Sequence, residues 1–167
     1  LNQDIHFNGF SRFHGLSINV SGNYNLKETD PFYHHYLGGW IGLQGYPYFA
    51  VNGQGTGLIR IKYGETLFQF LDFKTLGISP RHVVLYQFFE FGKAFNAFEN
   101  NLLSDLGMQL RVDTYQNLKF SASVAYPLQI AESQQKQSEN ATQIITYPKD
   151  FKYYISLSYQ YDLTEGL

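Results

Sequence analysis

Several residues have side chains that can bind a metal ion. His34 and His35 are adjacent, and three further histidines, His6, His14 and His82, are scattered along the chain. Neighbouring residues on a strand point to opposite faces, so the adjacent pair would not converge on one ion. We therefore interpret the histidines as loop residues, and we predict no metal site.

Glu90 is a candidate general base, because carboxylates accept protons in many active sites. No serine or second acid shares its face of the strand, and the sequence contains no G-x-S-x-G motif. The glycine-rich run 53–57 has phosphate-loop spacing, but a strand pattern rather than a helix follows it. With no cysteine, thiolate chemistry is excluded as well. We predict a protein that is not an enzyme and needs no cofactor, with Glu90 as a hydrogen-bond acceptor.

The composition is unusual for a soluble domain. Of 167 residues, 16% are charged, against roughly 25% in ordinary soluble domains. The 15 Phe and 14 Tyr residues favour strands. The 12 basic and 14 acidic residues give a net charge of −2 without a basic run, so nucleic acid is not an expected partner. No apolar stretch reaches the roughly 20 residues of a membrane helix, but transmembrane β-barrels need no such stretch.

Apolar and polar residues alternate along most of the chain, which is the pattern of strands with two different faces. No segment has a convincing helical period. The predicted strands are 16–24, 59–63, 82–93, 105–113, 118–126 and 151–163, with a weaker one at 4–10. Most are close to the roughly 9 to 11 residues with which a tilted strand crosses a bilayer.

The connections between these strands differ in length. Those at 11–14 and 114–116 are short, whereas those at 25–55 and 128–149 are long. Outer-membrane barrels have short periplasmic turns on one rim and long extracellular loops on the other. Within the second long loop, the polar stretch 131–143 is predicted to be mobile.

The polar faces of the strands carry mostly small residues and four cations, Arg60, Lys62, Arg111 and Lys119. We expect these cations to line a lumen, where they either attract ions or merely solvate the wall. The apolar faces carry aromatic residues near the strand ends, such as Tyr126, as the aromatic girdles of membrane barrels do. This pattern favours a lipid-facing exterior, and a soluble barrel with its apolar face inward is the alternative.

Two short motifs occur among the strands. They are Leu43-Gln44-Gly45-Tyr46 in the first long loop and Phe88-Phe89-Glu90-Phe91-Gly92 on a later strand. Together they resemble the C-terminal barrel of the bacterial surface antigen superfamily, which contains outer-membrane assembly factors and two-partner secretion transporters. The resemblance covers about residues 13 to 163.

In that family the long loop folds into the lumen with a V-R-G-Y or V-R-G-F tip, and a facing strand carries F-x-D-x-G. The resemblance implies the same docking here, with Gln44 in place of Arg and Glu90 in place of Asp. A carboxylate-to-amide hydrogen bond would replace an ion pair and would be weaker, so replacing Gln44 by Arg should stabilise the loop. The last strand, with Tyr159, Tyr161 and Leu163, resembles the C-terminal signal of outer-membrane barrels.

Seven strands and a loop do not close a barrel, because bacterial single-chain barrels have even strand numbers. Five of the predicted strands follow the long loop, as in the family's barrel of about sixteen strands. We therefore predict an all-β fold, an antiparallel transmembrane β-barrel, in which residues 1–167 form the C-terminal part of a larger barrel. A hidden strand near 32–42 is the alternative.

The resemblance implies a protein of the Gram-negative outer membrane that acts in the translocation or membrane insertion of a polypeptide or a lipid. Membrane lipids are then expected partners, together with a passenger polypeptide and periplasmic domains or accessory proteins. Two alternatives stay open: a barrel that only anchors another domain or forms a passive, porin-like pore, and a soluble ligand-binding barrel.

Overall fold

The structure is a computed structural model, and every regular element that it describes is a β-strand. The described residues are 2–11, 14–25, 35–40, 42–69, 80–95, 102–114, 117–138 and 141–159. Of residues 2–11, 68, 69, 80, 133–138 and 141–143, only the backbone is described. Across these ranges we find no helix with the length and hydropathy needed to cross a membrane.

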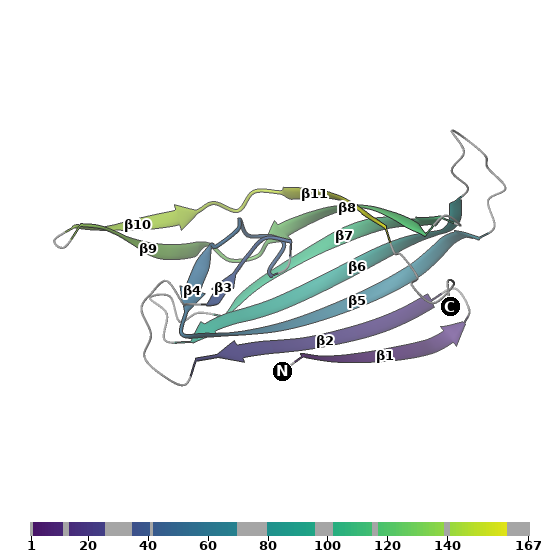
Figure 1. Ribbon diagram of the computed structural model, residues 1–167, viewed down its shortest axis with the longest axis horizontal. Helices are drawn as coiled ribbons and strands as arrows, with labels where there is room; N and C mark the ends of the chain where they lie inside the picture. Colours follow the sequence, from purple (N-terminus) through teal and green to yellow (C-terminus); the bar gives the residue numbers. More distant parts are fainter. Residues whose placement is uncertain are drawn as a thin grey trace, which may run out of the picture.

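Seven antiparallel strands form one open sheet in the order β1-β2-β5-β6-β7-β8-β11 (Figure 1). Their bounds are β1 Asn2–Ser11, β2 His14–Tyr24, β5 Gly55–Gln69, β6 Pro80–Phe95, β7 Leu103–Thr114, β8 Leu118–Pro127 and β11 Lys152–Tyr159. The prediction of an all-β antiparallel fold is confirmed. The two edge strands, β1 and β11, do not pair with each other, so the described residues form an open sheet rather than a closed barrel.

All seven predicted strands belong to this sheet, but several are longer than predicted. The largest difference is β5, which spans fifteen residues against the five predicted at 59–63. Its ladder with β6 continues in both directions beyond the alternating apolar residues, from Gly55 to Gln69. Backbone hydrogen bonding extends the strand where side chains give no period-two signal. The predicted end of the last strand, with Tyr161 and Leu163, lies outside the described residues.

Two small hairpins lie outside the main sheet. β3 (His35–Leu37) pairs with β4 (Val51–Gly53), so the strand near 32–42 exists but does not join the sheet. β9 (Ala131–Ser138) pairs with β10 (Ala141–Tyr147). The described part of the stretch 131–143, which we expected to be a loop, is therefore paired as strands. A polar segment cannot build a core, but it can still pair its backbone with a β-favouring partner such as Ile144–Tyr147.

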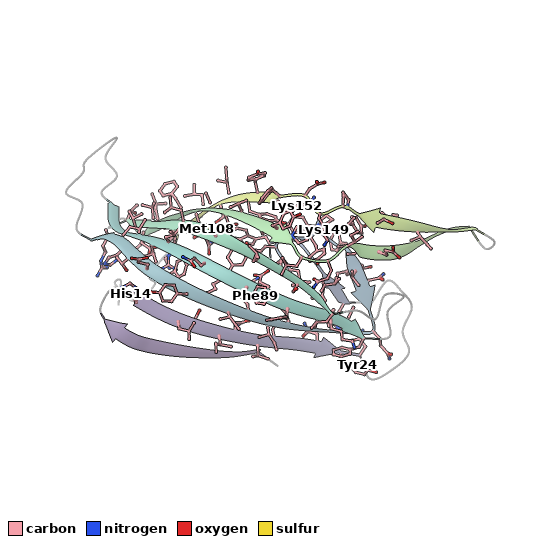
Figure 2. All side chains as sticks on the ribbon, turned by 180° about the vertical axis from the view of Figure 1, so that it is seen from behind. His14, Tyr24, Phe89, Met108, Lys149 and Lys152 are labelled. Atoms are coloured by element: carbon pink, nitrogen blue, oxygen red, sulfur yellow. The ribbon has the colours of Figure 1, made fainter. Side chains whose placement is uncertain are left out.

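The sheet has one exposed apolar face. Successive residues of a strand point to opposite sides, and the register aligns the apolar ones in rows, such as Ile18 with Ile61 and Phe89. Ile155 is 91% exposed and Tyr153 is 74% exposed. Other large exposed members are Leu16, Val20, Ile59, Tyr63, Leu106, Met108, Leu110, Leu157 and Tyr159. Phe89 and Met108 are labelled in Figure 2. We call this surface the outer face.

The opposite face, which we call the inner face, is polar and carries a folded loop. The β3–β4 hairpin lies against β5 and β6, and residues 38–50 connect its two strands (Figure 1). The buried apolar cluster lies between this loop and the sheet. It consists of Leu37, Leu43, Tyr46, Ala50, Val51, Leu58, Ala94, Leu103 and Ala131. The loop, not a second sheet, therefore supplies the core of the described structure.

Candidate functional site

The tip of the loop is a tight turn that presents two backbone N–H groups. The N–H of Tyr46 donates to the carbonyl of Leu43 at 3.2 Å, and the N–H of Gly39 donates to the carbonyl of Tyr46 at 2.9 Å. These bonds close the turn around Gln44 and Gly45. Because the turn itself uses neither of their N–H groups, both are available to the inner face of the sheet.

Two carboxylates of the sheet accept these N–H groups. The N–H of Gln44 donates to Glu90 Oε2 at 2.8 Å, and that of Gly45 donates to Asp105 Oδ2 at 2.6 Å. Glu90 on β6 and Asp105 on β7 are cross-strand partners, and both are fully buried. Hydrogen bonds to ionised acceptors are roughly twice as strong as neutral ones. The turn therefore docks through its main chain onto a pair of acids.

Two glycines permit this close approach. A Cβ atom on Gly45 would lie 2.6 Å from Asp105 Cβ and 2.9 Å from the backbone nitrogen of Pro127. A Cβ atom on Gly92 would lie 2.9 Å from Leu43 Cδ1. All three of these distances are shorter than van der Waals contact allows. Each motif therefore has its glycine for a steric reason. A Cβ atom on the tip glycine would clash with the wall, and a Cβ atom on the wall glycine would clash with the tip.

Arg60 supplies the positive charge of this site. It lies on β5 opposite Glu90, with which it forms an ion pair, and its Nη2 donates to the carbonyl of Gly42 at 2.7 Å. The guanidinium thus binds both the wall and the loop. One cross-strand row, Arg60-Glu90-Asp105, contains all three side chains. We call these three residues and the tip, Leu43 to Tyr46, the docking site.

The contact of Gln44 with Glu90 differs from the predicted one. The donor is the backbone N–H of Gln44, whereas its side-chain Oε1 accepts from the hydroxyl of Ser123 on β8 at 3.1 Å. The expectation of a side-chain amide as the donor is therefore wrong. At this close range the backbone N–H groups of the turn reach the carboxylates directly. The side chain of Gln44, only 2% exposed, extends along the inner face to β8.

Two tyrosines extend the docking to further strands. The hydroxyl of Tyr46 donates to the carbonyl of Ser104 on β7 at 3.1 Å. The hydroxyl of Tyr154 on β11 donates to the carbonyl of Gln44 at 2.9 Å, and its ring packs against Trp40 with centroids 5.7 Å apart. Including Arg60 on β5, five neighbouring strands of the sheet hold the loop, from β5 to β11.

The four predicted lumen-lining cations all lie on the inner face, but only Arg60 joins the docking site. Lys62 Nζ lies 5.9 Å from the ring centroid of Tyr86, and Arg111 Cζ lies 5.2 Å from the same centroid. Lys119 is the register partner of Asp113 at the far end of β8. Of the remaining predicted residues, Phe88 is buried opposite Gly107, and Tyr159 is exposed at the described end of β11.

Asp105, Ser123 and Tyr154 are functional residues of the docking site that the sequence argument missed. Each lies on the polar side of its own alternation, which was the available signal. Their convergence depends on strand register, which places Asp105 beside Glu90 although they belong to different strands. Alternation within a single strand carries no information on register.

The polar groups of the docking site and the nearby histidines are engaged in contacts within the structure. Glu90 is occupied by Arg60 and the tip, and within the described residues no cluster of three or more His, Asp or Glu side chains could hold a metal ion. His35 Nε2 lies 3.1 Å from Asn25 Oδ1, and His14 Nδ1 lies 2.6 Å from the hydroxyl of Tyr63, so these two histidines have separate local partners. No family model, curated protein or solved structure matches the chain.

Proposed function

We propose that the chain forms part of a transmembrane β-barrel of the bacterial surface antigen type in the Gram-negative outer membrane, acting in the translocation or membrane insertion of a polypeptide or a lipid. One observation carries this proposal. A single sheet has an exposed apolar outer face and a polar inner face on which a loop is docked through buried acids and an arginine.

The outer face supports contact with lipid. Large exposed apolar patches on soluble monomers rarely exceed a few hundred Å², whereas here exposed apolar side chains lie on five strands of the sheet, β2, β5, β6, β7 and β11. Among the described side chains, alternation places charges on this face only near strand ends: Glu65, opposite the first residue of β2, and Arg81 and Lys93, near the two ends of β6. The region between them has none, and a cation at the bilayer midplane costs about 2 to 4 kcal/mol.

The inner face argues against the soluble ligand-binding alternative. A soluble barrel of that kind lines its cavity with apolar side chains and turns its polar face to water. In this sheet the face that carries the loop has Glu90, Asp105 and Gln109 buried on it, and the opposite face exposes the apolar residues. A water-filled lumen on the inner side suits the polar face, and lipid on the outer side suits the apolar face.

The edges of the sheet support a larger barrel. β1 and β11 each have one side without a strand partner in the described sheet, and unpaired backbone groups cost several kcal/mol each in hydrocarbon. Further strands that close the barrel remove this cost. Five strands of the sheet, β5, β6, β7, β8 and β11, follow the loop, which agrees with the family's barrel of about sixteen strands.

In this proposal the protein acts by a change of conformation, not by chemistry. The loop is held by hydrogen bonds to the wall and by the buried apolar cluster, and the hydrogen bonds can be exchanged for water when the loop leaves the wall. The position of the loop then sets how much of the lumen is open to a passenger. This reversible docking distinguishes a moving part from a permanent plug.

A disulfide that locks the loop tests this function. The chain has no cysteine, so Gln44→Cys with Ser123→Cys, at two positions whose native side chains are in contact, gives one bridge between tip and wall when the protein is oxidised together with a short dithiol that replaces the length of the glutamine side chain. We expect liposomes that contain the intact full-length variant to speed the insertion of an unfolded outer-membrane barrel. This activity should be lost when the variant is oxidised and regained when it is reduced. The matched control is Ser121→Cys with Ser156→Cys, which bridges β8 to β11, where the two hydroxyl oxygens lie 2.7 Å apart.

Equal activity of the oxidised lock and the oxidised control would contradict the moving loop and favour a membrane anchor or a passive pore. A native protein that stays in solution without detergent would contradict the membrane barrel itself. The intact mass of the native polypeptide tests the larger barrel, because a value well above 19.3 kDa is expected.

A further inference from the structure

Beyond the loop tip, the inner face carries a cluster of positive charge. Lys62 on β5 and Arg111 on β7 both lie near the Tyr86 ring, with Nζ of Lys62 at 5.9 Å and Cζ of Arg111 at 5.2 Å from its centroid. Lys119 follows on β8, opposite Asp113. Three cations therefore share this part of the wall with one carboxylate among the described side chains. We call Lys62, Arg111 and the ring of Tyr86 the cationic site.

The acids nearby offset only one of the two charges of the cationic site. Glu90 is bound by Arg60 and by the N–H of Gln44. Asp113 accepts from Arg111 Nη2 at 3.0 Å, which leaves Arg111 Nε buried without a hydrogen-bond partner. The ammonium of Lys62 donates one proton to Gln109 Oε1 at 3.2 Å, and an ammonium has three. Donors thus remain on both cations of the site.

Two like charges beside one ring repel each other, and their repulsion is stronger next to a low-dielectric wall than in water. The ring offers its negative face to them, but a neutral ring does not remove the excess charge. An oxyanion between the two side chains would accept from both and offset the repulsion. Guanidinium and ammonium groups are the side chains that bind carboxylate and phosphate oxygens most strongly.

We propose that Lys62 and Arg111 form a binding site for a small oxyanion, a phosphate or carboxylate group of a solute in the lumen. This inference rests on the proposed function in one respect, because it requires the inner face to meet water. The site adjoins the docked tip, since Gln109 is the register partner of Ser123, which binds the side chain of Gln44. A solute bound there occupies the lumen directly beside the loop.

Thermal unfolding of the intact full-length protein in detergent, with inorganic phosphate as the probe, tests the site. A ligand that binds only the folded state raises its melting temperature. We expect saturating phosphate to raise the melting temperature by about 2 to 4 °C relative to sodium chloride of the same ionic strength. Lys62→Gln with Arg111→Gln should abolish the shift, and each single variant should weaken the apparent phosphate affinity about tenfold.

The control is Lys152→Gln, which removes a lysine of β11 whose register partner is Ala125, away from the site, and should keep the full shift. Lys62→Arg with Arg111→Lys keeps both charges and should retain most of it. No shift in the parent protein, or the same shift in the double variant, would overturn the site; if the double variant does not fold, the single variants decide. A shift produced by phosphatidylglycerol in the micelles but not by free phosphate would also overturn it.

This test can fail while the proposed function stands. The membrane location and the loop lock are measured by fractionation and by disulfide cross-linking, neither of which depends on phosphate. Conversely, a phosphate shift in a protein that proves soluble would support the oxyanion site and contradict the barrel.

Discussion

The inner face has two regions. Both contain cations and acids, but the two regions differ in the ratio of cations to acids. In the docking site, one guanidinium, Arg60, lies beside two buried acids, Glu90 and Asp105, and each acid accepts one backbone N–H group of the loop. In the cationic site, two cations, Lys62 and Arg111, lie beside one carboxylate, Asp113. The ratio of acids to cations thus distinguishes the two regions: backbone N–H groups dock on the acids, and a solute oxyanion is expected on the cations.

Removing the cation from each region should give the largest contrast. Arg60→Met leaves buried Glu90 and Asp105 without a counter-charge, which should lower the free energy of unfolding by about 3 to 5 kcal/mol. Lys62→Met removes one of two repelling cations and should cost less than about 1 kcal/mol. Denaturant unfolding in detergent micelles measures both. Equal losses in the two variants would show that Arg60 is not the principal counter-charge of the loop.

A methyl group at the tip should give the next largest effect. Gly45→Ala forces a Cβ atom against Asp105 and Pro127, and overpacking of this kind costs about 1 to 3 kcal/mol. Limited proteolysis of the loop should become several-fold faster in this variant. Gly15→Ala is the control, because a Cβ atom there meets nothing within 4 Å. Identical cleavage rates in both variants would contradict docking by close backbone approach.

An arginine at the tip should have the smallest effect. The sequence resemblance led us to expect that Gln44→Arg stabilises the loop, but Arg60 and the backbone of Gln44 already bind the two oxygens of Glu90. We now expect no gain, and a change in unfolding free energy within about 1 kcal/mol. Limited proteolysis and denaturant unfolding of Gln44→Arg measure this change, with Gln44→Met as the uncharged control. A clear gain specific to arginine would mean that the loop, not the wall, is the better place for the cation.

The alternation of polar and apolar residues was sufficient to predict the strands of the sheet and the two faces. Leu16 and Val20 are exposed on the outer face as their pattern indicates, and Gln44 and Glu90 meet, through the backbone N–H of Gln44, where the two motifs imply a contact. What single strands could not predict is register. Only register places Arg60 and Asp105 on either side of Glu90.

The main-chain contacts of the loop tip could not be predicted from the sequence either. Every residue except proline has an N–H group, so no residue type marks the tip as a donor through its backbone. The hairpin β9–β10 was missed for a related reason, because polar composition says little about backbone pairing.

The central claim is that the outer face of the sheet lies against lipid while the inner face meets water. Because the chain has no cysteine, single-cysteine variants along β11 test it directly in native membranes with a membrane-impermeant maleimide. We predict that Ser156→Cys and Ser158→Cys are labelled, whereas Ile155→Cys and Leu157→Cys react only after unfolding in urea. Labelling of all four positions at the same rate in intact membranes would contradict the account.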